Sequence, residues 1–349
     1  MSGSTVLFRV DATAAMGMGH LMRCRAIAEA VAEQGGTVVF AMVDPLPAAQ
    51  AMMDGIPARL LSLPGPAGSQ PDLQELLGLM RSLHPCITVV DGYHLDDAYW
   101  RRVAEAGPLA ALWDAADRQV VCADVIIDAS PNASATAYAA ISAQALMLLG
   151  PRYALIRRDI REAARQVPLP LRQRQQVLVS FGGSDPLNLS MALLPVLRQR
   201  LPDSVDITVL AGAAYPHHQD LRELADKVVP PVQVVVNPPS VAPLFCRAGL
   251  VISAAGGTIG ELVALGLPAL SVVVAQNQAA ASVDGPYPCI DGRVPGAEQR
   301  IAAHAAAMWQ DLAGRERVVQ TLRGVVDGEG AVRVARALLT THFRERLPS

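Results

Sequence analysis

The feature that most constrains the fold is an alternation of short apolar runs with amphipathic segments, which occurs in both halves of the chain. The apolar runs have the length of buried strands, and the segments between them carry apolar side chains at helical spacing. Strands that alternate with helices predict βαβ units and a parallel sheet. In the first half we expect strands at residues 5–10, 37–43, 86–91, 109–114 and 125–130, and helices at 20–35 and 72–84.

The alternation is interrupted by a polar segment, REAARQVPLPLRQRQQ (161–176), which reads as an interdomain linker because it contains two prolines and no apolar period. A chain of 349 residues also exceeds one ordinary hydrophobic core. We therefore predict an α/β fold with two doubly wound, Rossmann-like domains that face a cleft. The N-terminal domain spans 1–165, the C-terminal domain spans 176–330, and a closing helix and tail span 331–349. In the second half we expect strands with their turns at 176–183, 206–212, 232–237, 250–257 and 267–275, and helices at 189–201, 240–248, 258–266 and over most of 298–344.

Composition excludes several classes of function. Hydrophobic residues make up 51% and charged residues 17%, and the net charge of −3 gives no electrostatic hold on a nucleic acid. The five cysteines are widely spaced without a CxxC pair, so free thiols in a reducing cytoplasm are expected rather than disulfides or zinc. No leader pattern is present, and no apolar run approaches the roughly 20 residues that span a bilayer. We expect a cytoplasmic protein with no membrane partner, and nothing in the sequence requires more than a monomer.

Three glycine-rich turns follow predicted strands: MGMGH (16–20), FGGSD (181–185) and SAAGGTIGE (253–261). Glycine lets the backbone approach a ligand closely, and the helix that follows offers free N–H groups and the positive end of its dipole. This combination suits a phosphate or a diphosphate bound beyond the carboxyl ends of the strands, in the cleft between the two domains. The candidate binding residues in these turns are Gly17, Gly19, Gly182, Gly183, Ser184, Ala255, Gly256 and Gly257.

None of the three turns is a complete dinucleotide fingerprint. Asp44, after the second strand, is the best candidate for a ribose-binding acid, so a nicotinamide enzyme is possible but poorly supported. The GGTIGE segment allows two interpretations. Glu261 can close a capping box with Thr258, or it can accept hydrogen bonds from both hydroxyls of a ribose. The spacing alone does not separate these two roles.

His20 stands where a helix is about to begin, directly after a glycine turn. The helix dipole disfavours the imidazolium there, and a neutral histidine is a competent general base. The alternative is a histidine that only caps the helix or packs in the domain interface; its position at a strand end favours function. Asp91 can orient His20, face the cleft or start a turn, and Tyr93 is a plausible hydrogen-bonding partner. His94 is interpreted as a surface residue.

Taken together, these motifs resemble those of the UDP-2,4-diacetamido-2,4,6-trideoxy-β-L-altropyranose hydrolases of pseudaminic acid biosynthesis. The similar blocks occur in the same order along most of the chain, and the combination of FRxD, GxGH, FGGSD and AxNQ is specific to them. GGTxxE is shared with other two-domain UDP-sugar enzymes. The blocks are FRVDATAAMGMGHLMRCRAIAEAVAEQGGTVVFA, VVDGYHLDDAYWR, LLGPRYALIRRDI, VLVSFGGSDPLNLS, ISAAGGTIGELVALGLPALSVVVAQNQ and VDGEGAVRVARALL.

The resemblance implies a glycosyltransferase-B-like fold that binds a UDP-sugar. UDP would bind mainly to the carboxyl-terminal half, with the sugar against the amino-terminal half. The C1–O bond would be hydrolysed with inversion, and neither a metal nor a cofactor is expected. By position, His20 matches the catalytic histidine and Gly17 and Gly19 its flanking glycines. Gly256, Gly257, Thr258 and Glu261 match the uridine and ribose end, and Asn277 and Gln278 the pair next to the sugar.

Elementary chemistry agrees with that expectation. UDP is already a good leaving group, so the site needs one base for a water and donors that hold the diphosphate, rather than a pair of carboxylates. Two segments depart from the family pattern. Only Asp114 remains of an aspartate pair in LWDAAD, and residues 279–296 contain prolines and glycines that forbid a long helix. The identity of the sugar therefore stays open.

Two other functions are compatible with the sequence. A glycosyltransferase of the same fold would need an acceptor surface, and near MGMGH only Leu21, Met22 and Arg23 offer one. A nucleotide-sugar-binding protein without catalysis is the third interpretation, for which residues 279–296 are the only indication.

Overall fold

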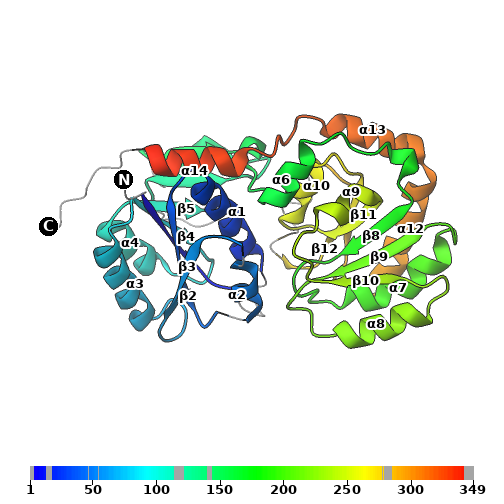
Figure 1. Cartoon of the computed structure of the whole chain (residues 1–349), viewed down its shortest axis with the longest axis horizontal. Coiled ribbons are helices and arrows are strands. Elements are labelled where there is room, and N and C mark those ends of the chain that lie inside the picture. Colours follow the sequence, from blue (N-terminus) through cyan, green and yellow to red (C-terminus); the bar gives the residue numbers. More distant parts are fainter. Residues whose placement is uncertain are drawn as a thin grey trace. The chain divides into compact units, whose positions relative to one another are not determined.

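A computed structural model describes residues 4–12, 18–45, 47–53, 55–113, 122–139, 144–276, 278 and 285–341. The chain divides into two compact units (Figure 1). The first unit comprises Met1–Arg158 together with Glu329–Ser349, and the second comprises Asp159–Gly328. Each unit is a parallel sheet with helices packed against it, so the predicted fold class of two doubly wound α/β domains is confirmed.

The sheet of the first unit has seven strands in the order β3-β2-β1-β4-β5-β6-β7, and all neighbouring strands are parallel. The order reverses between β1 and β4, where Val10 pairs with Asp91. Side chains on both faces of the central strands are buried, which explains the continuous apolar runs in the sequence. The strands are β1 Thr5–Val10, β2 Thr37–Val43, β3 Ala58–Leu63, β4 Ile87–Asp91, β5 Leu109–Leu112, β6 Val125–Asp128 and β7 Leu146–Leu149.

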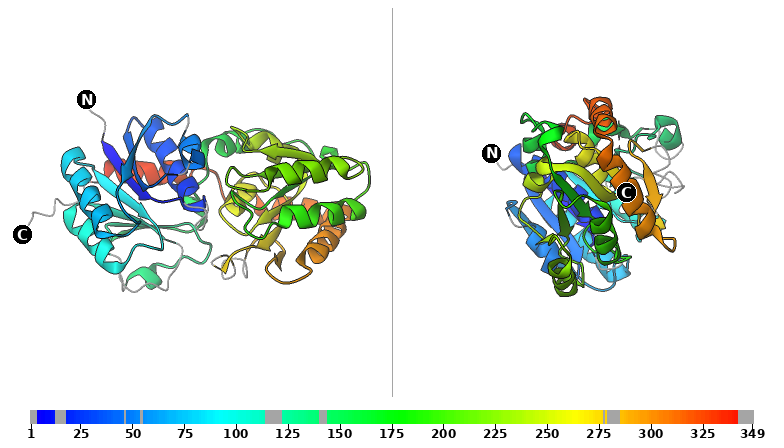
Figure 2. Two further views of the ribbon diagram at one scale, coloured as in Figure 1. Left: turned by 90° about the horizontal axis from the view of Figure 1, so that it is seen from below. Right: turned by 90° about the vertical axis from the view of Figure 1, so that its right-hand side faces the viewer.

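The last helix of the chain belongs to the first unit, although the second unit lies between them in sequence. α14 packs beside α1, and its apolar face joins the core formed by β1, β2 and α1 (Figures 1 and 2). At its first residue, Gly330, the same helix also approaches the backbone after η1, where a Cβ would lie 2.2 Å from the carbonyl oxygen of Ala154. The closing helix is therefore a part of the first core rather than a separate appendage. The helices are α1 Gly19–Glu33, α2 Pro47–Met53, α3 Gln70–Leu83, α4 Asp97–Ala106, α5 Ala135–Ala139, the 3-10 turn η1 Pro151–Tyr153 and α14 Gly330–Thr340.

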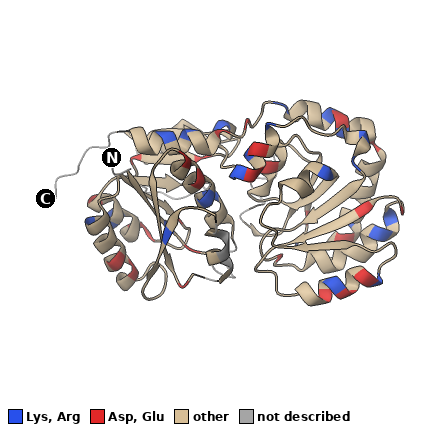
Figure 3. Cartoon of the chain, in the orientation of Figure 1, with Lys and Arg blue, Asp and Glu red and all other residues tan. Residues whose placement is uncertain are grey.

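The sheet of the second unit has six parallel strands in the order β10-β9-β8-β11-β12-β13, and its order reverses between β8 and β11. Charged residues lie mainly on the helices, and the strands are almost free of them (Figure 3). The strands are β8 Gln176–Ser180, β9 Asp206–Ala211, β10 Gln233–Val236, β11 Ala248–Ala254, β12 Ala269–Val273 and β13 Cys289–Asp291. The helices are α6 Arg158–Ala164, η2 Leu171–Gln173, α7 Leu189–Arg200, α8 His218–Lys227, α9 Ala242–Arg247, α10 Thr258–Ala264, α12 Ala297–Gln310 and α13 Leu312–Leu322.

The segment that we expected to be a linker (161–176) is built into the second unit. Asp159, in α6, accepts hydrogen bonds from the Ser240 hydroxyl at 2.9 Å and from the Val241 amide at 3.1 Å. The Arg174 guanidinium donates to the Leu169 and Ala248 carbonyl groups. Hydrogen bonds between charged side chains and the backbone thus hold this segment in place, although its sequence has no apolar periodicity. In the atypical segment 279–296, the described part contains the short edge strand β13, which the sequence did not indicate.

Candidate active site

The predicted turns that the structure describes lie where the strand order of each sheet reverses. In the first sheet, His20 follows β1 and Asp91 ends β4, and these two strands are neighbours. In the second sheet, the FGGSD turn follows β8 and the SAAGG turn follows β11, and these strands are also neighbours. The carboxyl edge at such a switch point is where open α/β sheets bind ligands. The fold therefore places both groups of candidate residues at the position that favours binding.

His20 and Asp91 form a buried pair at the edge of the first sheet. Nδ1 of His20 lies 2.6 Å from Oδ1 of Asp91, which is completely buried, while the His20 side chain is 10% exposed. Arg23 reaches the same carboxylate with two atoms: Nε donates to Oδ2 and Nη2 donates to Oδ1, both at 2.6 Å. Because a carboxylate can only accept, Nδ1–H of His20 donates to it, and Nε2 is the nitrogen that can act as a base.

The charge on Asp91 is secured by these contacts. Burial alone would raise its pKa, but the Arg23 guanidinium and the hydrogen bonds from Arg23 and His20 outweigh burial and hold the pKa of Asp91 at about 2. The Nη2 atom of Arg23 also lies 3.1 Å from Nδ1 of His20. The surroundings of His20 are thus set by a carboxylate and a guanidinium as well as by the helix terminus. Since Asp91 is enclosed, its place is behind the histidine rather than in contact with a ligand.

Tyr93 meets His20 through its ring. The two ring centroids are 4.7 Å apart with an interplanar angle of 79°, an edge-to-face contact. The interpretation of His94 as a surface residue is wrong. Its side chain is 23% exposed, and Nε2 lies 2.8 Å from Oδ2 of the fully buried Asp11. The turn after β4 therefore makes two contacts at this edge of the sheet: Tyr93 packs against His20, and His94 bonds to Asp11.

A network of buried charges lies beneath this edge. Arg9, on β1, contacts Asp11 through Nη1 and Asp72 through Nη2, each at 2.6 Å. Tyr99 donates its hydroxyl proton to Asp72 at 2.8 Å and accepts a hydrogen bond from Nε of Arg9 at 3.0 Å. Arg9, Asp11 and Asp72 are all completely buried. The charged side chains of the FRxD motif therefore support the candidate site from within the core. Their partners come from distant parts of the sequence.

The FGGSD turn is built from the backbone. Gly182 has a φ of +83°, a conformation that favours glycine. Gly212, after β9, packs against Gly183 so closely that a Cβ at position 212 would lie 2.4 Å from the Gly183 Cα. Asp185, three residues before the N-cap Asn188, satisfies the first two amides of α7, because its oxygens accept the amide protons of Leu189 at 2.9 Å and Ser190 at 2.8 Å. Burial raises the pKa of Asp185, and these hydrogen bonds offset only part of that effect.

In the SAAGGTIGE turn, α10 begins at Thr258 and its N-cap is Gly257, so Thr258 is not the capping residue that one of the two interpretations required. Glu261 lies in the first turn of this helix and is mostly buried. Gln278 approaches the same turn: its Oε1 accepts the Val274 amide proton at 2.9 Å, and its Nε2 lies 3.6 Å from where a Cβ on Gly256 would be.

The structure thus brings the predicted residues together in two groups. His20, Gly19, Asp91 and Tyr93 meet at the edge of the first sheet. In the second unit, Gly182, Gly183 and Ser184 follow β8, Ala255, Gly256, Gly257, Thr258 and Glu261 follow β11, and Gln278 follows β12, which are consecutive strands in the sheet. Gly17, Asn277 and Asp114 lie outside the described residues.

Sequence reasoning named Arg23 only as part of a possible acceptor surface and missed its contact with Asp91. Residues three apart lie on the same side of a helix, so the spacing of His20 and Arg23 in HLMR was the available signal. Arg9, Asp72 and Tyr99 carried no comparable signal, since they come from β1, α3 and α4 and meet only in the fold.

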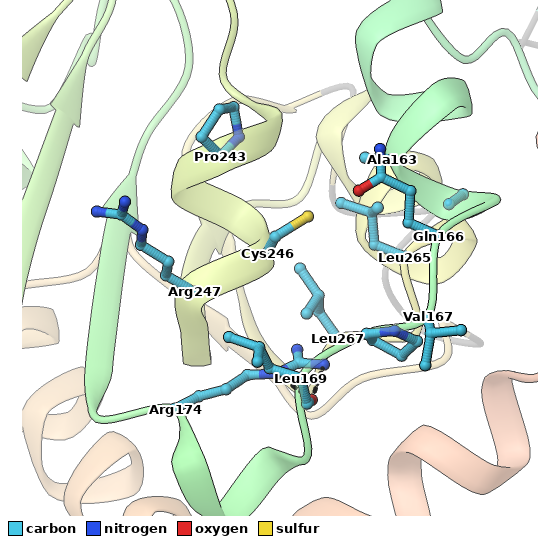
Figure 4. Close-up of a pocket in the computed structure, with 12 residues that line it drawn as sticks. Ala163, Gln166, Val167, Leu169, Arg174, Pro243, Cys246, Arg247, Leu265 and Leu267 are labelled. Atoms are coloured by element: carbon cyan, nitrogen blue, oxygen red, sulfur yellow. Dashed lines mark hydrogen bonds between the residues drawn. The ribbon is translucent and has the colours of Figure 1, made fainter.

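A cavity of about 320 Å³ in the second unit lies away from these turns (Figure 4). It is lined by Cys246, Leu265 and Leu267, and by Val167 and Leu169 of the segment that we expected to be a linker. Residues 246 and 267 come just before β11 and β12, so the cavity lies at the amino edge of the sheet. Among the described residues, no group of three or more histidine, cysteine or acidic side chains is placed to hold a metal ion. None of the helices in the described part of the chain combines the length and hydropathy that a bilayer crossing requires.

Comparison with curated proteins gives distant relatives, and no family model matches the chain. The UDP-2,4-diacetamido-2,4,6-trideoxy-beta-L-altropyranose hydrolase of Campylobacter jejuni is 23% identical over 276 residues, which cover 78% of this chain and 93% of that protein. The spore coat polysaccharide biosynthesis protein SpsG of Bacillus subtilis is 30% identical over 133 residues, 38% of each chain. The uncharacterized protein MJ1062 of Methanocaldococcus jannaschii is 22% identical over 233 residues, and the match spans only 44% of its length.

Solved structures with the same fold cover nearly the whole chain. Phytolacca americana UGT2, complexed with UDP-2fluoro-glucose and pterostilbene, matches with a TM-score of 0.67 and 13% identity over 97% of this chain and 99% of its own. Acinetobacter baumannii MurG matches with a TM-score of 0.61 and 15% identity over 97% of this chain and all of its own. Anabaena Alr3699/HepE in complex with UDP-glucose matches with a TM-score of 0.58 and 14% identity, over 96% and 99%. The fold is thus of the glycosyltransferase-B type.

Proposed function

We propose that this protein is a UDP-sugar hydrolase that releases UDP and the free sugar from a UDP-linked 2,4-diacetamido-2,4,6-trideoxy sugar. The observation that carries the proposal is the His20–Asp91 pair at the switch point of the first sheet, with a nitrogen–oxygen distance of 2.6 Å. A buried histidine that a carboxylate orients, with its second ring nitrogen left to meet a water molecule, can act as a general base. The similarity to the Campylobacter jejuni hydrolase, over 93% of its length, supports this choice of substrate.

In the proposed reaction, Nε2 of His20 takes a proton from a water molecule. The water oxygen forms a bond to the anomeric carbon, and the bond from that carbon to the UDP oxygen breaks. The electron pair of the broken bond leaves on the diphosphate, so the products are the free sugar and UDP, with inversion at C1. Asp91 stays charged and stabilises the imidazolium that forms, while Arg23 keeps Asp91 in place.

The second unit supplies the proposed UDP site. The backbone amides of Gly182, Gly183 and Ser184 and those of Gly256 and Gly257 are the donors for the diphosphate, and no metal ion is required. Glu261, mostly buried in the first turn of α10, accepts hydrogen bonds from the ribose hydroxyls. The Phytolacca americana and Anabaena structures, which share the fold and hold UDP-2fluoro-glucose and UDP-glucose, support a UDP-sugar as the ligand.

A glycosyltransferase that uses a UDP-sugar donor is the second candidate. The observation that favours it is the likeness of fold to proteins such as Phytolacca americana UGT2, whose structure holds a UDP-sugar analogue together with pterostilbene. Here the oxygen that attacks C1 would belong to a second substrate. In that case UDP release would depend on an added acceptor, whereas hydrolysis needs only water.

The two candidates are separated by following the reaction in ¹⁸O-labelled water by NMR, with the UDP-linked altropyranose as substrate. Hydrolysis at C1 puts the label on the sugar and none on UDP, and the anomeric signal reports inversion. Label on UDP, or release of UDP only with an acceptor, contradicts the proposal. His304→Ala, at an exposed helix position of the second unit, is the matched histidine control for His20→Ala.

A further inference from the structure

The turn Gly92–Tyr93–His94, which follows β4, connects the core to the candidate base. It begins directly after Asp91, which holds His20 through its carboxylate. Its middle residue, Tyr93, packs against His20 with the two rings edge to face. Any movement of this turn therefore changes the surroundings of the imidazole. The third residue, His94, contacts Asp11 instead.

His94 is attached to a part of the molecule that cannot easily move. Its Nε2 donates to Oδ2 of Asp11 at 2.8 Å. The other oxygen of Asp11 accepts the Val43 amide proton at 2.8 Å, and Arg9 lies 2.6 Å from Oδ2. Fully buried and paired charges have little room to rearrange, because breaking one contact leaves an uncompensated charge. Asp11 is thus a fixed point for the turn.

The geometry of Gly92 shows that the turn is shaped around the His94 ring. A Cβ on Gly92 would lie 2.7 Å from Cε1 and 3.0 Å from Nδ1 of that ring. Nδ1 of His94 is buried and has no hydrogen-bond partner among the described residues. With Nε2 bonded to Asp11 and Nδ1 enclosed, the ring is poorly placed for proton transfer to a substrate. Its contacts are those of an anchor.

We propose that His94 is a positioning residue, which fixes Tyr93 against His20 by tying the turn to Asp11. Tyr93 in turn keeps the imidazole of His20 in the orientation that directs Nδ1 to Asp91 and leaves Nε2 to act as the base. The catalytic consequence rests on the proposed function of His20. The structural consequence, a single ring orientation and tautomer for His20, does not.

The test uses ¹⁵N NMR of the histidine side chains in the full chain, which reports the tautomer of His20 without any substrate. His94→Leu removes the anchor, and His94→Gln retains an N–H donor at similar reach. We expect one Nδ1–H tautomer for His20 in the wild type and in His94→Gln, and a mixture or exchange-broadened signals in His94→Leu. His304→Leu, at an exposed position, is the control. Circular dichroism confirms that each variant folds.

Tyr93→Leu provides a second route that leaves the His94–Asp11 contact in place. It should disturb the His20 signals as His94→Leu does, and the double variant should add little, because both act through one contact. An unchanged His20 tautomer in folded His94→Leu overturns the proposal. If that variant does not fold, an unchanged tautomer in Tyr93→Leu overturns it instead.

Activity then separates the two proposals. A misplaced base costs roughly ten- to a hundredfold in kcat, and we expect that loss in His94→Leu with little change in KM and with recovery in His94→Gln. If His94→Leu alters the His20 tautomer but His20→Ala itself retains full hydrolysis, the function proposed for His20 fails while the positioning role stands. If His20→Ala is inactive and His94→Leu retains both the tautomer and the rate, the positioning role fails alone.

Discussion

At the switch point of the first sheet the candidate groups are ionisable side chains, whereas at that of the second sheet they are mainly glycine backbone. His20, Asp91 and Arg23 depend on side-chain distances of 2.6 Å and on burial. Gly182 and Gly183 depend on a positive φ and on contact with Gly212. The same topological position thus offers two kinds of group: oriented side chains, as proton transfer requires, and backbone amides, as diphosphate binding requires.

This difference predicts that changes in the two units will affect different measurements. A change at the first edge should lower the rate of the chemical step and leave UDP binding intact. A change at the second edge should weaken UDP binding and alter the rate only through occupancy.

The largest effect is expected for His20→Ala. Removing a general base typically costs 10²- to 10⁴-fold, so we expect kcat to fall about 10³-fold. The dissociation constant of UDP, measured by isothermal titration calorimetry, should remain within about twofold, since the proposed UDP contacts lie in the second unit. A loss of UDP affinity comparable to the loss of rate would contradict the division of roles between the two units.

Gly212→Ala is the strongest test on the other side of the comparison. Its Cβ would lie 2.4 Å from the Gly183 Cα and carbonyl oxygen, and the backbone must move to admit it. We expect a loss of about 1–3 kcal/mol in the free energy of unfolding, as for other overpacked sites, together with at least a tenfold weaker affinity for UDP. Urea unfolding and calorimetry measure the two effects. Unchanged UDP binding in a destabilised protein would remove the FGGSD turn from the proposed site.

The two edges should also respond to pH with opposite signs. Asp91 has a pKa of about 2, below its ordinary 3.8, so its charge stabilises the fold above pH 3.8, and this contribution is lost as pH falls toward 2. The pKa of Asp185 is raised, so wild type gains stability from this group as pH falls through the raised value toward 3.8. The advantage of wild type over Asp91→Asn, about 2 kcal/mol from the pKa difference, should shrink on acidification.

The advantage of wild type over Asp185→Asn should instead grow. Pulse proteolysis at increasing urea concentration, with peptides identified by mass spectrometry, gives the stability of each unit separately. The slope to compare is the change with pH in the stability difference between wild type and each variant. Parallel slopes for the two variants would show that the carboxyl groups have similar surroundings, contrary to the geometry.

The sequence predicted most of the fold because buried parallel strands and amphipathic helices leave a periodic pattern. It missed β3 and β7, whose patterns are partly exposed, and it placed the helix at 331–340 in a separate segment because nothing local shows that it packs on α1. In the site, His20 and the glycine turns were identifiable from local context. Arg9 and Asp11 were noted only as part of the FRxD motif and Asp72 was not noted, because a buried charge network is defined by partners that only the fold brings together.

The smallest effect is expected for Gly257→Ala, and it separates binding from stability. No atom lies within 4 Å of a Cβ at this position, and φ is −55°, so alanine fits without strain. Stability should stay the same or rise slightly, because alanine restricts the unfolded chain more than glycine does. If the diphosphate approaches this backbone closely, the added methyl group should still weaken UDP binding by a few fold. Gly36→Ala is not a suitable control, since a Cβ there would lie 2.6 Å from Val31 Cγ1, whereas Gly78→Ala, in α3, is a matched change outside the proposed site, because the nearest atom to its Cβ is Nη2 of Arg81 at 3.9 Å. Equal UDP affinity in Gly257→Ala and Gly78→Ala would show that the nucleotide does not approach the backbone closely at Gly257, and would remove this residue from the proposed site.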